Sequence, residues 1–252
     1  MVEVCRTRPS SRRPFRFRRM TGMREFWDER AREDAFYFVD NRIKYKDPAE
    51  EERFWEMGRS DLDKLLGALD VALEPEWVVV EIGCGVGRLT RVVAERAGAV
   101  KALDVSAEML SIAQNENTTL ANVEWILGDG VSLAGVDDGV ADAVVSHVVF
   151  QHIPDPQITL GYIREVGRVL RSGGVAALHL SNDKQVHEQK QPLGERMRSL
   201  VGRAPKGQAH EAWTGSAVEL DDVRAAAADG GMAVEKVVGE GTQYMVVRLR
   251  RE

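Results

Sequence analysis

A buried strand followed by a glycine-rich turn constrains this chain most strongly. Residues 77–82 read Trp-Val-Val-Val-Glu-Ile, and glycines follow at positions 83, 85 and 87. An almost wholly apolar, β-branched run is typical of a parallel strand that is covered on both faces. The glycines indicate a tight turn with positive φ angles, where another group can approach the backbone closely. A helical apolar pattern then begins at Arg88 and continues to about residue 97.

Two further predicted strands also end at an acidic residue. Strand 99–104 ends at Asp104, and strand 123–127 runs into Gly128-Asp129-Gly130. Predicted helices at 88–97 and 107–116 separate the strands, so the segment reads as consecutive βα units of a parallel sheet. Around the first turn the order is Glu-x-Gly-x-Gly-x-Gly, which differs from the Gly-x-Gly-x-x-Gly of dinucleotide-binding proteins.

These three strand ends resemble the cofactor motifs of the class I S-adenosylmethionine (SAM) methyltransferases. In that family the acid after the second strand binds both ribose hydroxyls, and an acid after the third contacts the adenine amino group. A carboxylate can accept two hydrogen bonds at once, which suits the ribose role. The resemblance therefore implies SAM as cofactor, held by Glu81, Gly83, Cys84, Gly85, Gly87, Asp104, Val105, Met109, Gly128, Asp129, Gly130, Ser146 and His147.

The predicted fourth strand, 140–146, leads into a stretch that resembles the family's motif IV. It reads His-Val-Val-Phe-Gln-His-Ile-Pro-Asp over residues 147–155, and in the family this strand end faces the methyl group and the substrate. The Asn/Asp-Pro-Pro-Tyr run of enzymes that methylate exocyclic amines of bases or glutamine amides is absent, which disfavours those reactions. His147 and His152 are candidate general bases, because histidine exchanges protons near neutral pH. A purely structural role for either is the alternative.

The second half of the chain predicts how the sheet ends. A helix opens at Asp155-Pro156, and strand 175–180 follows Arg-Val-Leu-Arg-Ser-Gly-Gly at 168–174, which resembles a family motif with Ser172 in place of proline. After a helix at 219–229, strands 232–238 and 243–250 form a hairpin. The predicted fold is α/β, with a Rossmann-like seven-stranded sheet, mostly parallel with a C-terminal antiparallel hairpin, and helices on both faces. A dinucleotide-binding sheet would continue with parallel units instead.

Three regions are expected along the chain. Residues 1–22 form a basic leader, with seven arginines and one acid in the first 19 residues, and we expect it to be disordered. Residues 23–70 carry helices at 24–39 and 48–69, the second capped by Asp47, and such helices cap the pocket in the family. Residues 71–252 form the SAM-binding domain, with a polar insertion at 182–218 that includes a short helix at 193–201.

Four aromatic side chains are candidates for the acceptor pocket. Trp27 and Tyr37 lie in the first predicted helix, and His210 and Trp213 lie near the end of the insertion. Packing against the domain is the alternative role for all four.

Composition limits the partners and the compartment. The net charge is −6, and because the leader is basic the remainder is more acidic still, which argues against nucleic acid as the main partner. No apolar run approaches the length of a membrane span, and five scattered histidines lack metal-ligand spacing. The two cysteines form no disulfide framework, so a reducing, cytoplasmic compartment is expected. The oligomeric state does not follow from the sequence.

The sequence thus predicts a SAM-dependent methyltransferase that acts on a small-molecule acceptor by in-line displacement. Such a reaction chiefly requires alignment of the nucleophile, the methyl carbon and the leaving sulfur. Two alternatives stay open: a non-catalytic SAM-binding or regulatory module, and an NAD-linked Rossmann oxidoreductase.

Overall fold

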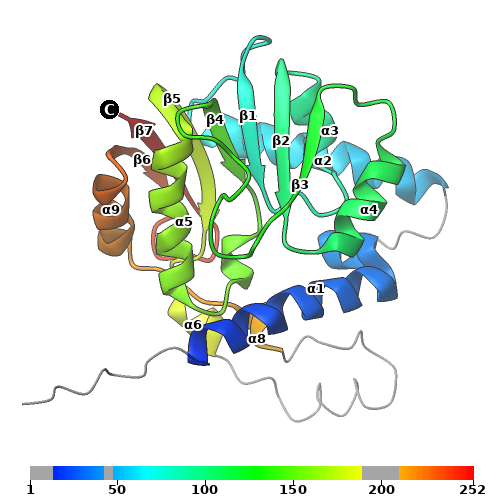
Figure 1. Cartoon of the computed structure of the whole chain (residues 1–252), viewed down its shortest axis with the longest axis horizontal. Coiled ribbons are helices and arrows are strands. Elements are labelled where there is room, and N and C mark those ends of the chain that lie inside the picture. The colour runs from blue at the N-terminus through cyan, green and yellow to red at the C-terminus, as the bar shows by residue number, and fades with distance from the viewer. Residues whose placement is uncertain (1–13, 43–47, 189–209) are drawn as a thin grey trace, which may run out of the picture.

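The computed structural model describes residues 14–42, 48–188 and 210–252. Within these ranges, a seven-stranded sheet in the order β3-β2-β1-β4-β5-β7-β6 forms the centre (Figure 1). Its strands are β1 (Val78–Ile82), β2 (Ala99–Asp104), β3 (Val123–Leu127), β4 (Ala141–Ser146), β5 (Leu170–Leu180), β6 (Met232–Val238) and β7 (Met245–Arg251). The predicted fold class is confirmed.

Strand pairing distinguishes this sheet from a dinucleotide-binding one. Strands β1, β2, β3, β4 and β5 pair in parallel, whereas β7 runs antiparallel to both β5 and β6. The order reverses between β1 and β4, because the chain first moves outward to β3 and then returns. In open α/β sheets, ligands bind beyond the carboxyl ends of the strands at such a reversal.

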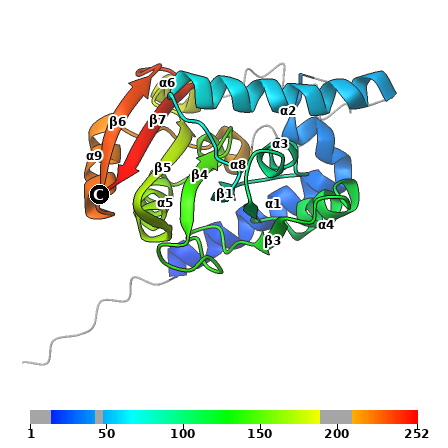
Figure 2. The ribbon, with the colours of Figure 1, turned by 90° about the horizontal axis from the view of Figure 1, so that it is seen from above.

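Helices cover both faces of the sheet (Figure 2). One face carries α2 (Pro48–Ala68), α3 (Thr90–Ala94) and α4 (Ala107–Glu116), and the other carries α5 (Pro156–Val169) and α9 (Leu220–Asp229). Neighbouring residues of β1 point to opposite faces: Val79 packs in the cluster with Leu62 and Val93, and Val80 packs with Ile163 and Val166. Both valines are fully buried, as expected for a strand between two helical layers.

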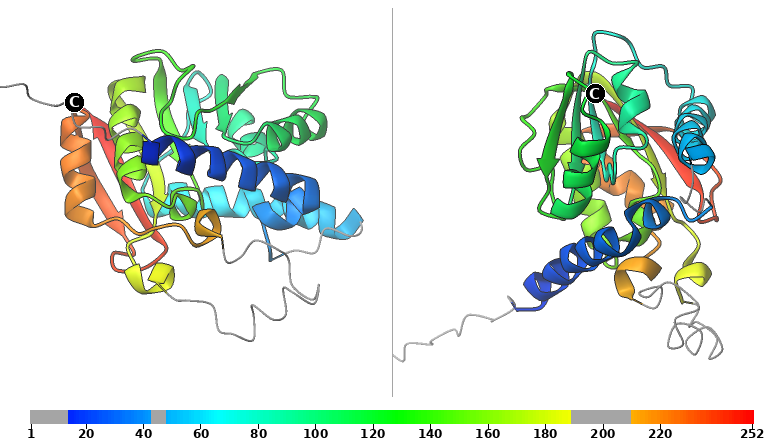
Figure 3. Two further views of the ribbon diagram at one scale, coloured as in Figure 1. Left: turned by 60° about the horizontal axis from the view of Figure 1, so that its bottom comes forward. Right: turned by 90° about the vertical axis from the view of Figure 1, so that its right-hand side faces the viewer.

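Helix α1 (Pro14–Val39) crosses the carboxyl ends of the parallel strands (Figures 1 and 3). The helix is kinked at Asp34, whose φ of −168° and ψ of 84° are not helical. An Asp34 carboxylate oxygen accepts a hydrogen bond from the Tyr37 backbone N–H at 3.1 Å, which caps the short helical piece beyond the kink. The kink redirects the end of α1 toward the glycine turn.

The elements differ from the sequence expectations at several boundaries. Helix α1 begins at Pro14, so residues 14–22 of the leader are helical where we expected disorder. The reason is that proline suits a first helical position and no further proline or glycine occurs before Gly22. Helix α3 is shorter than the expected 88–97, and β5 starts at Leu170, which pairs with Ala141 across a bulge.

Other expectations fall outside the described residues. These are residues 1–13 of the leader, the Asp47 cap and the helix at 193–201. The insertion is described only through α6 (Lys184–Glu188) and from residue 210, where α8 (Glu211–Thr214) follows. No described helix is both long enough and apolar enough to serve as a membrane span.

Candidate cofactor and acceptor site

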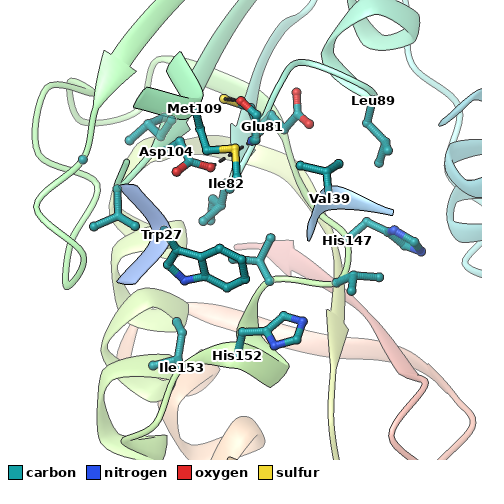
Figure 4. Close-up of a pocket in the computed structure, with 18 of the residues that line it drawn as sticks. Trp27, Val39, Glu81, Ile82, Leu89, Asp104, Met109, His147, His152 and Ile153 are labelled. Atoms are coloured by element: carbon teal, nitrogen blue, oxygen red, sulfur yellow. Dashed lines mark hydrogen bonds between the residues drawn. The ribbon is translucent and has the colours of Figure 1, made fainter. Parts of the chain in front are cut away.

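A pocket lies beyond the carboxyl ends of β1, β2 and β4, beneath α1 (Figure 4). The empty space of this pocket, open mouth included, is about 1110 Å³. In the close-up, Glu81, Asp104 and Met109 lie on one side of the Trp27 ring, and His152 and Ile153 lie on the other. Glu81 and Asp104 come from the strand ends that resemble the cofactor motifs, and Met109 comes from α4.

The glycine turn brings the backbone against the pocket. Gly83 and Gly85 have φ angles of +75° and +55° and both line the cavity. A Cβ on Gly83 would lie 2.3 Å from a Val149 methyl carbon, and one on Gly85 would lie 2.9 Å from a Val39 methyl carbon. Glycine is therefore required at both positions, by conformation and by space.

Asp104, at the end of β2, is held by backbone donors. One carboxylate oxygen accepts from the Gly85 N–H at 2.8 Å, and the other accepts from the Ser106 N–H at 2.9 Å. A carboxylate has about four acceptor sites, so this group can also accept from a ligand. Burial raises the pKa of this group, although the side chain still borders the cavity.

Glu81 is the most unusual charge in the pocket. It is 4% exposed, and burial raises its pKa to about 7. Within the described part of the chain, its Oε2 atom has no hydrogen-bond partner. A buried carboxylate oxygen without a partner is costly and points to a missing donor or cation.

These features fit the cofactor that the sequence implies. SAM carries hydroxyls, an ammonium group and a sulfonium charge, and the pocket offers two carboxylates with spare acceptor sites. The two glycines leave the backbone open beside them. Residues Glu81, Gly83, Cys84, Gly85, Asp104, Val105, Met109, Gly128 and His147 of the predicted cofactor set all line this cavity.

The other members of the predicted cofactor set do not line the pocket. The Asp129 carboxylate accepts from the Val131 and Ser132 N–H groups, each at 2.8 Å, and so caps a turn. Ser146 donates its hydroxyl to the Ile82 carbonyl at 3.0 Å, which joins the ends of β4 and β1. A Cβ on Gly87 would lie 2.6 Å from the Asn117 amide nitrogen, and one on Gly130 would lie 3.1 Å from the end of Met23.

Both candidate bases line the cavity after β4. His147 directly follows the strand, and His152 lies in the short helix η1 (Phe150–His152). Burial lowers the pKa of each imidazole to about 4, so both are neutral at pH 7. His152 Nδ1 lies 2.9 Å from the Trp213 carbonyl oxygen. Because a carbonyl can only accept, Nδ1 carries the proton and Nε2 is left as an acceptor.

The predicted acceptor residues separate into one that lines the pocket and three that do not. Trp27 lines it and meets the His152 ring edge-on at 5.6 Å between centroids. Trp213 packs against His152, with 5.3 Å between the ring centroids, and does not line the pocket. His210 stacks on Phe26, with 4.5 Å between the ring centroids. Tyr37 packs edge-on against Phe38 and does not reach the cavity.

Polar contacts from one stripe of α1 fix the helix over the pocket. Arg24 donates to the Gly128 carbonyl at 2.8 Å, and Asp28 accepts from the Ser106 hydroxyl at 2.6 Å. One turn further, Arg32 pairs with Glu108 at 2.7 Å. The three α1 residues are spaced by four and therefore share a helix face.

A buried ion network anchors the far end of α1. Arg88, beside the glycine turn, lies 2.7 Å from Asp61 on α2 and 3.4 Å from Asp40, just after α1. Arg42 bridges the same two carboxylates. Arg88, Asp40 and Asp61 are each less than 10% exposed, so the network holds α1, α2 and the turn together.

Several pocket residues were not predicted from the sequence. Met23, Phe38 and Val39 come from α1, Arg88 and Leu89 follow the turn, and Leu133, Ile153 and Tyr162 complete the apolar wall. A spacing of four between Arg24, Asp28 and Arg32 was the available signal that this helix docks by a polar face. Among the described residues, no group of three or more histidine, cysteine or acidic side chains could hold a metal ion.

Comparisons with known proteins agree with this geometry. Residues 80–178 match the model of a methyltransferase domain family. Phosphoethanolamine N-methyltransferase 1 of Caenorhabditis elegans is 31% identical over 126 residues, 50% of this chain and 26% of that protein. Demethylmenaquinone methyltransferase of Tropheryma whipplei is 32% identical over 96 residues, 38% of each protein. The matches thus span less than half the length of these relatives.

A solved structure shares the fold over nearly the whole chain. Magnesium protoporphyrin IX methyltransferase of Synechocystis, with bound SAH, superposes with a TM-score of 0.60 at 18% identity, and the match covers 93% of this chain and all of that one. The family match thus covers residues 80–178 of this chain, and the likeness to the solved structure shows the fold over nearly its whole length.

Proposed function

We propose that this protein transfers a methyl group from SAM to a small, uncharged acceptor with a substantial apolar part. One observation carries the proposal: a single pocket joins the carboxylates of Glu81 and Asp104 to a half that is walled by Trp27, His152 and Ile153. Helix α1 roofs this space, which suits a molecule that can be enclosed. A macromolecular substrate would have to present a thin projecting group.

Alignment is the main task of the side chains in this site. When bound, SAM supplies a methyl carbon that is already activated by its sulfonium charge. Asp104 and the glycine turn hold one partner, and Trp27 and His152 form flat walls for the other. Enclosure by α1 limits both partners to few orientations, which is the largest contribution a protein makes to such a displacement.

Proton removal is required only for an acceptor with a hydroxyl or amine proton. The neutral imidazoles of His147 and His152 can each accept a hydrogen bond from such a group. His152 is favoured, because the Trp213 carbonyl fixes its tautomer and leaves Nε2 as the acceptor. The Gln151 amide nitrogen lies 3.3 Å from Nε2 and donates to it, so an acceptor hydroxyl would take the place of this contact.

Charge supports an uncharged acceptor. Arg88 is the one cationic side chain among the described residues that line the pocket, and Asp61 and Asp40 already pair with it. One relative is named for phosphoethanolamine, a charged amine that bears a phosphate, and another is named for demethylmenaquinone, an uncharged quinone. An apolar cavity without a free cation suits a quinol-like or phenolic molecule better than a phosphate.

The test is acceptor-dependent release of S-adenosylhomocysteine. Purified protein and SAM are incubated with dihydroxy-naphthalenes, substituted phenols, indoles and phosphoethanolamine, and methylated products are identified by mass spectrometry. We expect turnover with a phenolic or quinol acceptor, and its loss in Asp104→Ala. Methylation of phosphoethanolamine alone would contradict the proposed acceptor class.

The same assay addresses a non-catalytic role. Tight binding of S-adenosylhomocysteine without turnover on any small acceptor, but with methylation of a protein or nucleic acid, would overturn the proposal. The His152→Gln and His147→Gln variants separate the two candidate bases. We expect the first to lower kcat more than the second for a hydroxyl acceptor.

A further inference from the structure

A strained peptide lies at the end of β4, in the wall of the pocket. Val148 has a φ of +57°, in the left-handed region. A β-branched residue in this conformation is a genuine outlier, and such outliers persist only where surrounding contacts hold them. The residues on either side, His147 and Val149, both border the cavity.

The contact that holds this peptide comes from β5. The Val148 backbone N–H donates to Nδ1 of His179 at 3.0 Å. On the other side of the ring, Nε2 lies 2.9 Å from the Gln243 carbonyl oxygen, before β7. Because the carbonyl can only accept, Nε2 carries the proton and Nδ1 is bare. The two bonds therefore require one neutral tautomer of His179.

The surroundings keep His179 in that state. The side chain is 3% exposed and does not line the pocket. Two other rings with titratable groups face it: His147, with ring centroids 5.4 Å apart, and Tyr244, which stacks at 6.0 Å. Burial lowers the pKa of His179, so the imidazole stays neutral near pH 7.

The Val148 conformation sets two parts of the pocket wall at once. It places the His147 side chain at the cavity, and it presses Val149 against Gly83 so closely that a Cβ there would lie 2.3 Å away. A relaxed φ at Val148 would rotate the adjoining peptides and displace both contacts. The wall at the end of β4 therefore depends on the His179 ring behind it.

We propose that His179 is a positioning residue: through its bond to the Val148 N–H, it holds His147 and Val149 against the reacting groups. This role rests on the proposed methyl transfer, because positioning at this point matters only if a reaction occurs there. His179 itself does not line the cavity; besides its bond to the Val148 N–H, its ring faces that of His147, and the variants below separate the bond from this ring contact.

Two variants separate the two hydrogen bonds of the ring. His179→Asn places a carbonyl oxygen near the position of Nδ1, so it keeps an acceptor for Val148. His179→Gln places its amide near Nε2, so it keeps a donor for Gln243 and loses the Val148 bond. If the Val148 bond is the functional one, Asn stays close to wild type, and Gln lowers kcat at least roughly tenfold with little change in KM.

A third variant tests the strain directly. Val148→Gly accepts a positive φ without cost, so the peptide no longer needs the His179 bond. We therefore expect His179→Gln to lower kcat less in the Val148→Gly background than in the wild type, as a double-mutant cycle would show. Equal and additive losses in both backgrounds, or equal losses in the Asn and Gln variants, would overturn the proposal.

A spectroscopic readout does not depend on turnover. In ¹⁵N-labelled protein, the His179 Nδ1 resonance should be that of an unprotonated imidazole nitrogen, coupled through the hydrogen bond to the Val148 N–H. The Val149 methyl resonances should shift in His179→Gln and stay in place in His179→Asn. A protonated Nδ1, or unchanged Val149 resonances in His179→Gln, would refute the positioning role. Absence of turnover alongside the expected spectra would refute only the proposed methyl transfer.

Discussion

Replacing Glu81 with glutamine should stabilise the protein without ligand at alkaline pH. The buried carboxylate has its pKa raised from 4.5 to about 7, because ionisation inside the protein is disfavoured. The native state therefore binds a proton more tightly than the unfolded chain does. The stabilising contribution of the protonated Glu81 is fully present below pH 4.5, and it is lost as the pH rises to about 7. Glutamine keeps the shape and removes this loss.

The size of the effect follows from the separation between the two pKa values. At about 1.4 kcal/mol per pH unit, the loss is on the order of 3 kcal/mol above pH 7. For a chain of 252 residues, this corresponds to a rise in Tm of roughly 5–10 °C for Glu81→Gln at pH 8.5. At pH 4.5 the variant and the wild type should differ little.

The assay is thermal unfolding of both proteins between pH 4.5 and 8.5, without ligand. Buried His147, His152 and His179 also make stability depend on pH, but they are common to both proteins and cancel in the difference. Glu76→Gln, which alters an exposed acid, is the matched control and should leave the difference flat. A Glu81→Gln protein that is equally or less stable than the wild type at pH 8.5 would refute this reasoning.

Three further predictions concern the elements around the pocket. Asp28→Ala removes the acceptor for the Ser106 hydroxyl, so it should lower the free energy of unfolding by about 1–2 kcal/mol and speed amide hydrogen exchange in α1. Glu25→Ala, at an exposed position of the same helix, should do neither. Unchanged exchange in Asp28→Ala would argue against the α1 anchor. Gly85→Ala should weaken S-adenosylhomocysteine binding at least roughly tenfold by calorimetry, because φ is +55° and the added Cβ would lie 2.9 Å from a Val39 methyl carbon. Gly67→Ala, where a Cβ meets open space, should bind normally. Asp61→Asn should lower the free energy of unfolding in urea by about 3–5 kcal/mol, because it leaves the Arg88 charge buried without this partner. Asp63→Asn, at a side chain that is 53% exposed, should lower it by less than about 1 kcal/mol. Equal losses in the two variants would contradict the network.

Local sequence patterns were sufficient for the sheet and for the residues at the strand ends that line the pocket. Strand hydrophobicity, the glycine turn and the acid at each strand end are encoded within a few residues, and β1, β2 and β3 follow them closely. Ser106 caps α4 by accepting from the Met109 N–H, and Asp155, where the sequence predicts a helix to open, accepts from the Gln157 N–H. Such short-range bonds depend only on neighbours in the chain.

The acceptor half depends on contacts between distant segments, which local patterns do not encode. Trp27 was predicted, but Phe38 and Val39 reach the cavity only because α1 bends at Asp34 and docks through Asp28. Periodicity treats α1 as a straight helix and says nothing about where it lies. Local patterns could not predict the strained conformation of Val148 either, because a residue from another strand holds it.

The most direct test of the central claim is calorimetric titration of the purified protein with S-adenosylhomocysteine and with NAD. The site predicts micromolar binding of S-adenosylhomocysteine, a loss of at least roughly tenfold in Asp104→Ala, and normal binding in Asp221→Ala, an exposed control. NAD should not bind. Binding of NAD, or S-adenosylhomocysteine binding that Asp104→Ala leaves unchanged, would contradict the assignment of this pocket as the cofactor site.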